Sequence, residues 1–108
     1  MSLDVYLSCP CCATLLFGAN ITHNLGAMAD AAGLYTAVWR PEEIGIATAA
    51  QLVEPLREGI ERLRAAPATF RALNPENGWG SYELFLPLLE EYLATCVAHP
   101  AALVRVSR

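Results

Sequence analysis

Residues 19–43, which read ANITHNLGAMADAAGLYTAVWRPEE, decide how the chain is organised. Their apolar positions recur every three to four residues, which predicts a helix with one buried face. These positions are Leu25, Met28, Ala29 and Ala32. Thr22 or Asn24 can cap the free N–H groups at the start of this helix, and Gly33 is the residue type expected just beyond its end.

Two strands are predicted before this helix. Ser2–Ser8 alternates apolar and polar residues, which is the pattern of a half-buried strand. Residues 14–19 (TLLFGA) are β-branched, aromatic and apolar, and they predict a second strand. The sequence Cys9-Pro10-Cys11-Cys12 lies between them, so we expect a hairpin with a cysteine-rich tip.

Two further helices and a strand are predicted after it. Thr48 and Gln51 form a capping-box pattern before a helix that extends to about residue 66. Ser81 can cap a last helix, and residues 101–106 predict a short strand. We therefore predict one α+β domain over residues 1–108, in which about three helices cover a small antiparallel sheet. The sheet consists of the N-terminal hairpin and the C-terminal strand.

Composition limits the partners of this chain. It has a net charge of −4, and its 7 basic residues never form a run. A groove for a nucleic-acid backbone needs clustered Lys or Arg, so we expect no nucleic acid. No signal peptide is recognisable and no apolar run has the length of a membrane span, so we expect a cytoplasmic protein without membrane contact. Scattered leucines and alanines leave a homodimer open.

Four strings carry a resemblance over nearly the whole chain, and they are MSLDVYL, ANITHNLGAMADAAGLYTAVWRPEEIG, NPENGWGSYELF and VRVSR. With them the chain resembles a family of small uncharacterised proteins of bacteriophages and bacterial genomes, for which NITHNL, WRPEE and NGWGSY are specific motifs. The resemblance implies a phage or prophage accessory protein in the host cytoplasm, and it implies no particular reaction. The segment that holds the cysteines looks variable in such proteins.

Polar and aromatic side chains gather in residues 20–24, 39–43 and 74–82. We predict that they form one ligand-binding surface, because helix N-termini present N–H donors and tryptophans can stack on flat rings. The residues concerned are Asn20, Thr22, His23, Asn24, Trp39, Arg40, Glu42, Glu43, Asn74, Asn77, Trp79 and Tyr82. Among them His23 is the best candidate for a general base.

The same residues also have plainer interpretations. The polar side chains of residues 20–24 can cap a helix, and His23 can satisfy a buried carbonyl group. Arg40 can pair with Glu43, and Trp79 can fill the core beneath a helix connection. These structural roles stay open beside the ligand-binding ones.

Three functions are compatible with this sequence. The leading prediction is an accessory protein that binds a small, polar, nucleotide-like ligand. One alternative is a protein–protein interaction module that acts on a host protein. The other is a small hydrolase or transferase in which His23 acts as base with Glu42 or Glu43.

The cysteine-rich turn predicts a metal site. Cys9 and Cys12 have the C-x-x-C spacing of a zinc knuckle, which makes structural zinc at these two residues a candidate. A closed zinc site needs four ligands, and Cys96 and His99 form a C-x-x-H pair that completes the number. Against this pairing, Cys96 falls on the apolar stripe of the last helix, where a cysteine behaves as a small hydrophobe.

Overall fold

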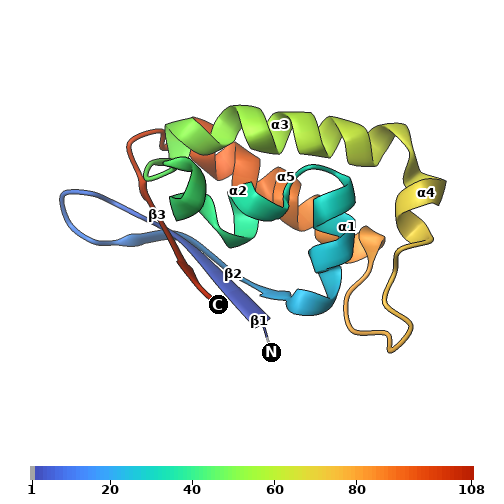
Figure 1. The fold of residues 1–108 in the computed structure, drawn as a ribbon. Helices are drawn as coiled ribbons and strands as arrows, with labels where there is room; N and C mark the ends of the chain where they lie inside the picture. The colour runs from blue at the N-terminus through green and yellow to red at the C-terminus, as the bar shows by residue number, and fades with distance from the viewer. Residues whose placement is uncertain (1) are drawn as a thin grey trace.

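A three-stranded antiparallel sheet forms one layer of the molecule, and helices cover one of its faces (Figure 1). This computed structural model describes residues 2–108. The strands are β1 (Ser2–Ser8), β2 (Leu15–Thr22) and β3 (Leu103–Ser107), arranged in the order β2-β1-β3. The predicted α+β class, with the C-terminal strand added to the N-terminal hairpin, is confirmed.

The helical layer is more divided than the sequence predicted. Its segments are η1 (His23–Leu25), α1 (Gly26–Ala31), α2 (Tyr35–Trp39), η2 (Pro41–Ile44), α3 (Ala49–Ala65), α4 (Pro67–Arg71) and α5 (Tyr82–Ala98). Only α3 and α5 are long. The expected three helices become more numerous because Gly33, at φ 73°, ends the α1 turn, and because Pro41 and Pro67 each begin a new segment. Within residues 2–108, no helix combines the length and the apolar character needed to cross a membrane.

The central strand β1 supplies one side of the core. Leu3, Val5 and Leu7 are fully buried against the helices, as the alternation predicts. Burial of such a side chain contributes about 1.5–3 kcal/mol to folding. On β2, Phe17 faces the same way and stacks on Tyr92 of α5 with ring centroids 5.0 Å apart.

Strand β2 extends three residues beyond the predicted end at Ala19, so the polar residues Asn20 and Thr22 lie in the sheet. In the antiparallel register Asp4 pairs with Asn20 and Ser2 pairs with Thr22. Asn20 and Thr22 therefore belong to the strand rather than to a helix. Thr22 still acts as the predicted cap, because its hydroxyl accepts a hydrogen bond of 3.3 Å from the backbone N–H of Asn24.

The segment between α5 and β3 is fixed against the start of α3. The backbone N–H groups of Ala49 and Ala50 donate to the carbonyl oxygens of Ala102 and Pro100, each over 2.9 Å. The predicted capping box of Thr48 with Gln51 begins α3 just before these contacts. Residues 99–102 are thus held firmly at one end of the molecule.

Candidate functional site

Two of the three predicted ligand-binding segments meet at a groove where β2 ends. The groove has a volume of about 510 Å³, and it is lined by Ser2, Asn20, Thr22, His23, Asn24, Asn77 and Trp79. The side chains from residues 20–24 lie at the end of the strand and in the short helix η1. The side chains from the 74–82 loop come from a segment more than 50 residues later, so the groove exists only in the folded protein.

Local hydrogen bonds and one glycine shape the loop beside β2. The side chain of Asn77 accepts a hydrogen bond of 3.0 Å from the backbone N–H of Trp79. Gly80 has φ 95°, and a Cβ atom there would lie 2.7 Å from Cγ2 of Thr22. The loop can approach the strand this closely because residue 80 has no side chain. Trp79 is 70% exposed, so its ring is available to a ligand.

His23 is oriented by a buried partner. The indole N–H of Trp39 donates to Nδ1 of His23 over 2.9 Å. An indole N–H can only donate, so Nδ1 is an acceptor and the neutral imidazole carries its proton on Nε2. In this state His23 offers an N–H donor to the groove rather than a base at Nδ1.

Trp39 itself offers no surface for stacking, contrary to our prediction. It is 1% exposed and packs on the ring of Tyr35, with centroids 5.4 Å apart, and on the edge of Phe85, with centroids 6.3 Å apart. Its size and apolar rings favour the core, and its one polar atom is satisfied by His23. Trp39 therefore orients His23 from the core side of the groove.

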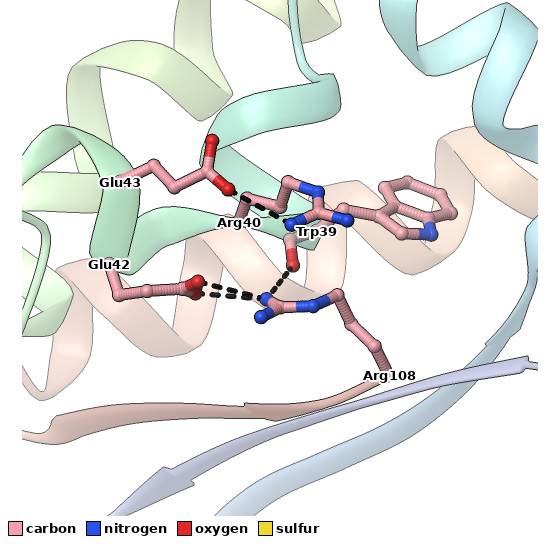
Figure 2. Close-up of polar contacts among 5 residues, drawn as sticks. All are labelled: Trp39, Arg40, Glu42, Glu43 and Arg108. Atoms are coloured by element: carbon pink, nitrogen blue, oxygen red, sulfur yellow. Dashed lines mark hydrogen bonds and ion pairs between the residues drawn. The ribbon is translucent and has the colours of Figure 1, made fainter.

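The charged residues of the 39–43 segment lie outside the groove. Figure 2 shows that Arg40 donates to the carboxylate of Glu43 over 2.9 Å. Arg108 donates over 3.0 Å to the carboxylate of Glu42, and over 2.8 Å to the backbone oxygen of Trp39. The hydrogen bond from Arg108 lowers the pKa of Glu42. Glu42 and Arg108 line a different hollow of about 360 Å³. The predicted plain interpretation, in which Arg40 pairs with Glu43, is the one observed.

Two predicted residues of the 74–82 loop have structural roles. Tyr82 is buried, and its hydroxyl donates to the backbone oxygen of Leu63 over 2.7 Å. The side chain of Asn74 accepts a hydrogen bond of 2.8 Å from the backbone N–H of Tyr82. These contacts fix the loop to the start of α5. Neither residue lines the groove.

Three cysteines meet at the hairpin tip, and they could hold a metal ion. The Sγ atoms of Cys9, Cys11 and Cys12 all lie within 4.8 Å of one another. The turn is closed by the backbone N–H of Cys9, which donates to Thr14 over 2.8 Å, and Ala13 adopts a left-handed φ of 59°. The C-x-x-C spacing singled out Cys9 and Cys12, and it missed Cys11 because that motif counts only its end residues.

Cys96 does not belong to this cluster. It is fully buried on α5, and burial raises the pKa of its thiol to about 12. Its sulfur lies in the core and outside the cluster of the three turn sulfurs, so Cys96 is placed where it cannot share an ion with them. This overturns the predicted C-x-x-C with C-x-x-H arrangement as a whole, and it leaves His99 to be considered on its own.

Similarity to other proteins does not indicate a function for this chain. Comparisons with protein-family models, with curated proteins and with solved structures each find no match. The groove and the cysteine turn therefore carry the functional conclusion.

Proposed function

We propose that the protein binds a small, polar, uncharged molecule with a flat ring, such as a nucleobase or a nucleoside, in the groove at the end of β2. One observation carries this proposal: an exposed indole stands beside hydrogen-bonding side chains drawn from two distant segments. These side chains are Asn20, His23, Asn24, Asn77 and Trp79. An indole face can stack on a flat ring while amide groups pair with the polar edge of that ring.

The charges around the groove favour a neutral ligand over a phosphorylated one. None of the described residues that line the groove is Arg. Arg40 was predicted to contribute to this surface, but it is paired with Glu43 outside the groove, so its guanidinium is not available to a phosphate there. Asn20 also donates over 2.7 Å to the carboxylate of Asp4, which adds negative charge nearby. A phosphate group would lose its hydration here without gaining a cation.

Binding without turnover fits these contacts better than hydrolysis or group transfer. A catalytic His23 was expected to work with Glu42 or Glu43, and both carboxylates are committed to arginines outside the groove. The function we propose is therefore capture of a ligand, in keeping with an accessory protein of phage type that withholds a small molecule in its host.

Native mass spectrometry of the protein as purified from cells tests this proposal. We expect an added mass that matches a nucleobase or nucleoside and that is lost on denaturation. Trp79→Ala should lose it, whereas Ile44→Ala, at a residue that is 54% exposed and outside the groove, should retain it. Retention of the adduct by Trp79→Ala, or its absence from the wild type at saturating added nucleosides, would contradict the proposal.

The cysteine turn supports a second candidate function. We propose that it binds structural zinc through Cys9 and Cys12, with Cys11 as a third ligand, because the three sulfur atoms already lie within 4.8 Å of one another. Zinc–sulfur bonds are about 2.3 Å long, so sulfur ligands of one ion lie about 3.5–4 Å apart. Metal analysis of protein expressed with added zinc should give one ion per chain, and Cys9→Ser should lose it.

A further inference from the structure

We infer that the imidazole of His99 is the fourth ligand of the ion held by Cys9, Cys11 and Cys12, so that zinc ties the hairpin tip to the end of helix α5. This inference rests on the proposed metal function of the cysteine turn. The site would be of the Cys₃His type, which is an established set for tetrahedral structural zinc.

The register of the sheet brings the two segments together. In the β1–β3 pair, Asp4 lies opposite Ser107 and Ser8 lies opposite Leu103. Continuing this antiparallel register beyond Ser8 sets the cysteine turn against the segment that precedes Leu103. His99 is the first residue of this segment, which comprises residues 99–102. In Figure 1 the hairpin tip projects toward the same end of the molecule as the C-terminal end of α5.

Cys9, Cys12 and His99 share one hollow. It has a volume of about 420 Å³ and lies between the hairpin tip and the segment that follows α5. Its lining residues are Cys9, Pro10, Cys12, Thr14, Leu16, His99, Pro100, Ala101 and Ala102. Apart from the two thiols, the hydroxyl of Thr14 and the imidazole, these side chains are apolar. Three of the four polar side chains in this otherwise apolar hollow are therefore potential zinc ligands.

His99 has a fixed backbone and an uncommitted side chain. Its backbone N–H donates to Thr95 over 2.9 Å and its carbonyl oxygen accepts from Ala102 over 3.0 Å. The side chain is exposed, and within residues 2–108 no hydrogen bond holds the imidazole. The ring lies outside the 4.8 Å cluster of the three sulfurs, so coordination requires it to rotate across the hollow toward the turn. Exposed side chains change rotamer on the picosecond to nanosecond timescale.

The remaining cysteine and the other histidine of the described chain are excluded by position. Cys96 lies one turn before His99 but is sealed in the core. His23, the other histidine, is committed to Trp39 at the groove. His99 is therefore the nitrogen ligand that the fold presents to the thiols.

Zinc bound in this way would fasten a projecting turn to the rigid part of the fold. The tip is attached to the protein through β1 and β2, whereas residues 99–102 are bonded to the start of α3. Binding to the folded state alone stabilises that state by mass action. The ion would thus raise the melting temperature of the protein.

Titration with Co(II), followed by displacement with zinc, tests the inference. We expect the wild-type protein to give the absorption bands of a tetrahedral cobalt–thiolate site, and zinc to raise the melting temperature. His99→Ala should weaken zinc binding at least about tenfold and change the cobalt bands, since loss of a direct ligand should cost no less than loss of an outer partner. Cys96→Ala serves as the control, because Cys96 lies outside the cluster of turn sulfurs, and it should keep the cobalt spectrum.

The outcomes separate this inference from the metal function on which it rests. If Cys9→Ser abolishes metal binding while His99→Ala leaves the affinity and the cobalt spectrum unchanged, the thiols bind metal and our assignment of His99 is wrong. If the wild-type protein binds neither cobalt nor zinc under reducing conditions, the metal function itself fails and the inference falls with it.

Discussion

The indole N–H of Trp39 reaches Nδ1 of His23 over 2.9 Å and so joins the hydrophobic core to the groove. Trp39 is buried, whereas His23 lines the groove. A buried N–H group without a partner costs about 1–3 kcal/mol, so breaking this hydrogen bond is unfavourable. The packed indole of Trp39 therefore holds the imidazole of His23 in one orientation. The candidate site is therefore rigid where His23 contributes to it.

Removal of the imidazole should destabilise the protein through its effect on Trp39. We expect His23→Ala to lower the free energy of unfolding by about 1–3 kcal/mol, because the indole N–H is left buried and unpaired. In a Trp39→Phe background His23→Ala should lower the free energy of unfolding by clearly less, because phenylalanine has no N–H group to leave unpaired. Urea unfolding of the two single variants and the double variant measures this coupling, and equal costs in both backgrounds would show that the hydrogen bond is not formed.

Two tyrosines should respond oppositely to loss of their hydroxyl groups. Within residues 2–108 the buried hydroxyl of Tyr92 has no hydrogen-bond partner, and burial raises the pKa of this phenol well above its ordinary value. Tyr92→Phe should therefore be neutral or stabilise the protein by about 1 kcal/mol. Tyr82→Phe loses a bond of 2.7 Å to Leu63 and should destabilise by a similar amount. Thermal unfolding of both variants provides the comparison, and a destabilised Tyr92→Phe would reveal a missed partner.

Gly59 is required by the packing of α3 on Leu34. A Cβ atom at residue 59 would lie 2.2 Å from Cγ of Leu34, far inside contact distance. Alanine favours a helix by about 1 kcal/mol over glycine, but overpacking costs about 1–3 kcal/mol, so we expect Gly59→Ala to destabilise. Glu58→Ala, at the exposed neighbouring residue, is the control and should change the unfolding midpoint little. Stabilisation by Gly59→Ala would mean that Leu34 moves aside freely.

The ion pair of Arg108 with Glu42 should make a pH-dependent contribution to stability. Arg108 lowers the pKa of Glu42 in the folded protein. A lowered carboxyl pKa stabilises the folded state above the ordinary glutamate pKa, and this stabilisation is lost as the pH falls through the lowered value. The stability difference between the wild type and Glu42→Gln should thus be present at neutral pH and vanish in acid. Urea unfolding at several pH values tests this, and a difference that persists in strong acid would contradict it.

Thiol reactivity should distinguish Cys96 from the cysteine turn. Cys11 and Cys12 are exposed and Cys9 is partly so, whereas Cys96 is buried with its pKa raised to about 12. A thiol-specific reagent should modify the three turn cysteines of the metal-free protein quickly and Cys96 only after unfolding, because the thiolate is the reactive form. Mass spectrometry of a time course counts the modified residues. Rapid modification of Cys96 would show that α5 is open in solution.

Much of the fold follows from local sequence patterns. The alternation of Leu3, Val5 and Leu7 predicted β1, and capping residues such as Ser81 predicted where the long helices begin. The end of β2 was missed because the apolar pattern that predicted the strand stops at Ala19, whereas pairing with Asp4 and Ser2 across the hairpin keeps Asn20 and Thr22 in the sheet. Tertiary pairing overrides local preference at such positions.

The candidate site was predictable only in part, for the same reason. The polar side chains of residues 20–24 and the polar and aromatic side chains of residues 74–82 correctly indicated the two segments that line the groove. Sequence could not show that Trp39 points into the core, because its periodicity within a five-residue helix is too short to define a face. Nor could it show that Glu42 is engaged by Arg108, which lies 66 residues away along the chain.

The most direct test of the groove as a binding site is NMR of ¹⁵N-labelled protein titrated with adenosine, guanosine, cytidine and uridine, and with their 5′-monophosphates. Our account predicts that at least one nucleoside shifts the backbone signals of residues 20–24 and 77–80 together with the indole signal of Trp79, and that its monophosphate binds no more tightly. Failure of every nucleoside to shift these signals, or shifts that cluster instead around Glu42 and Arg108, would contradict it.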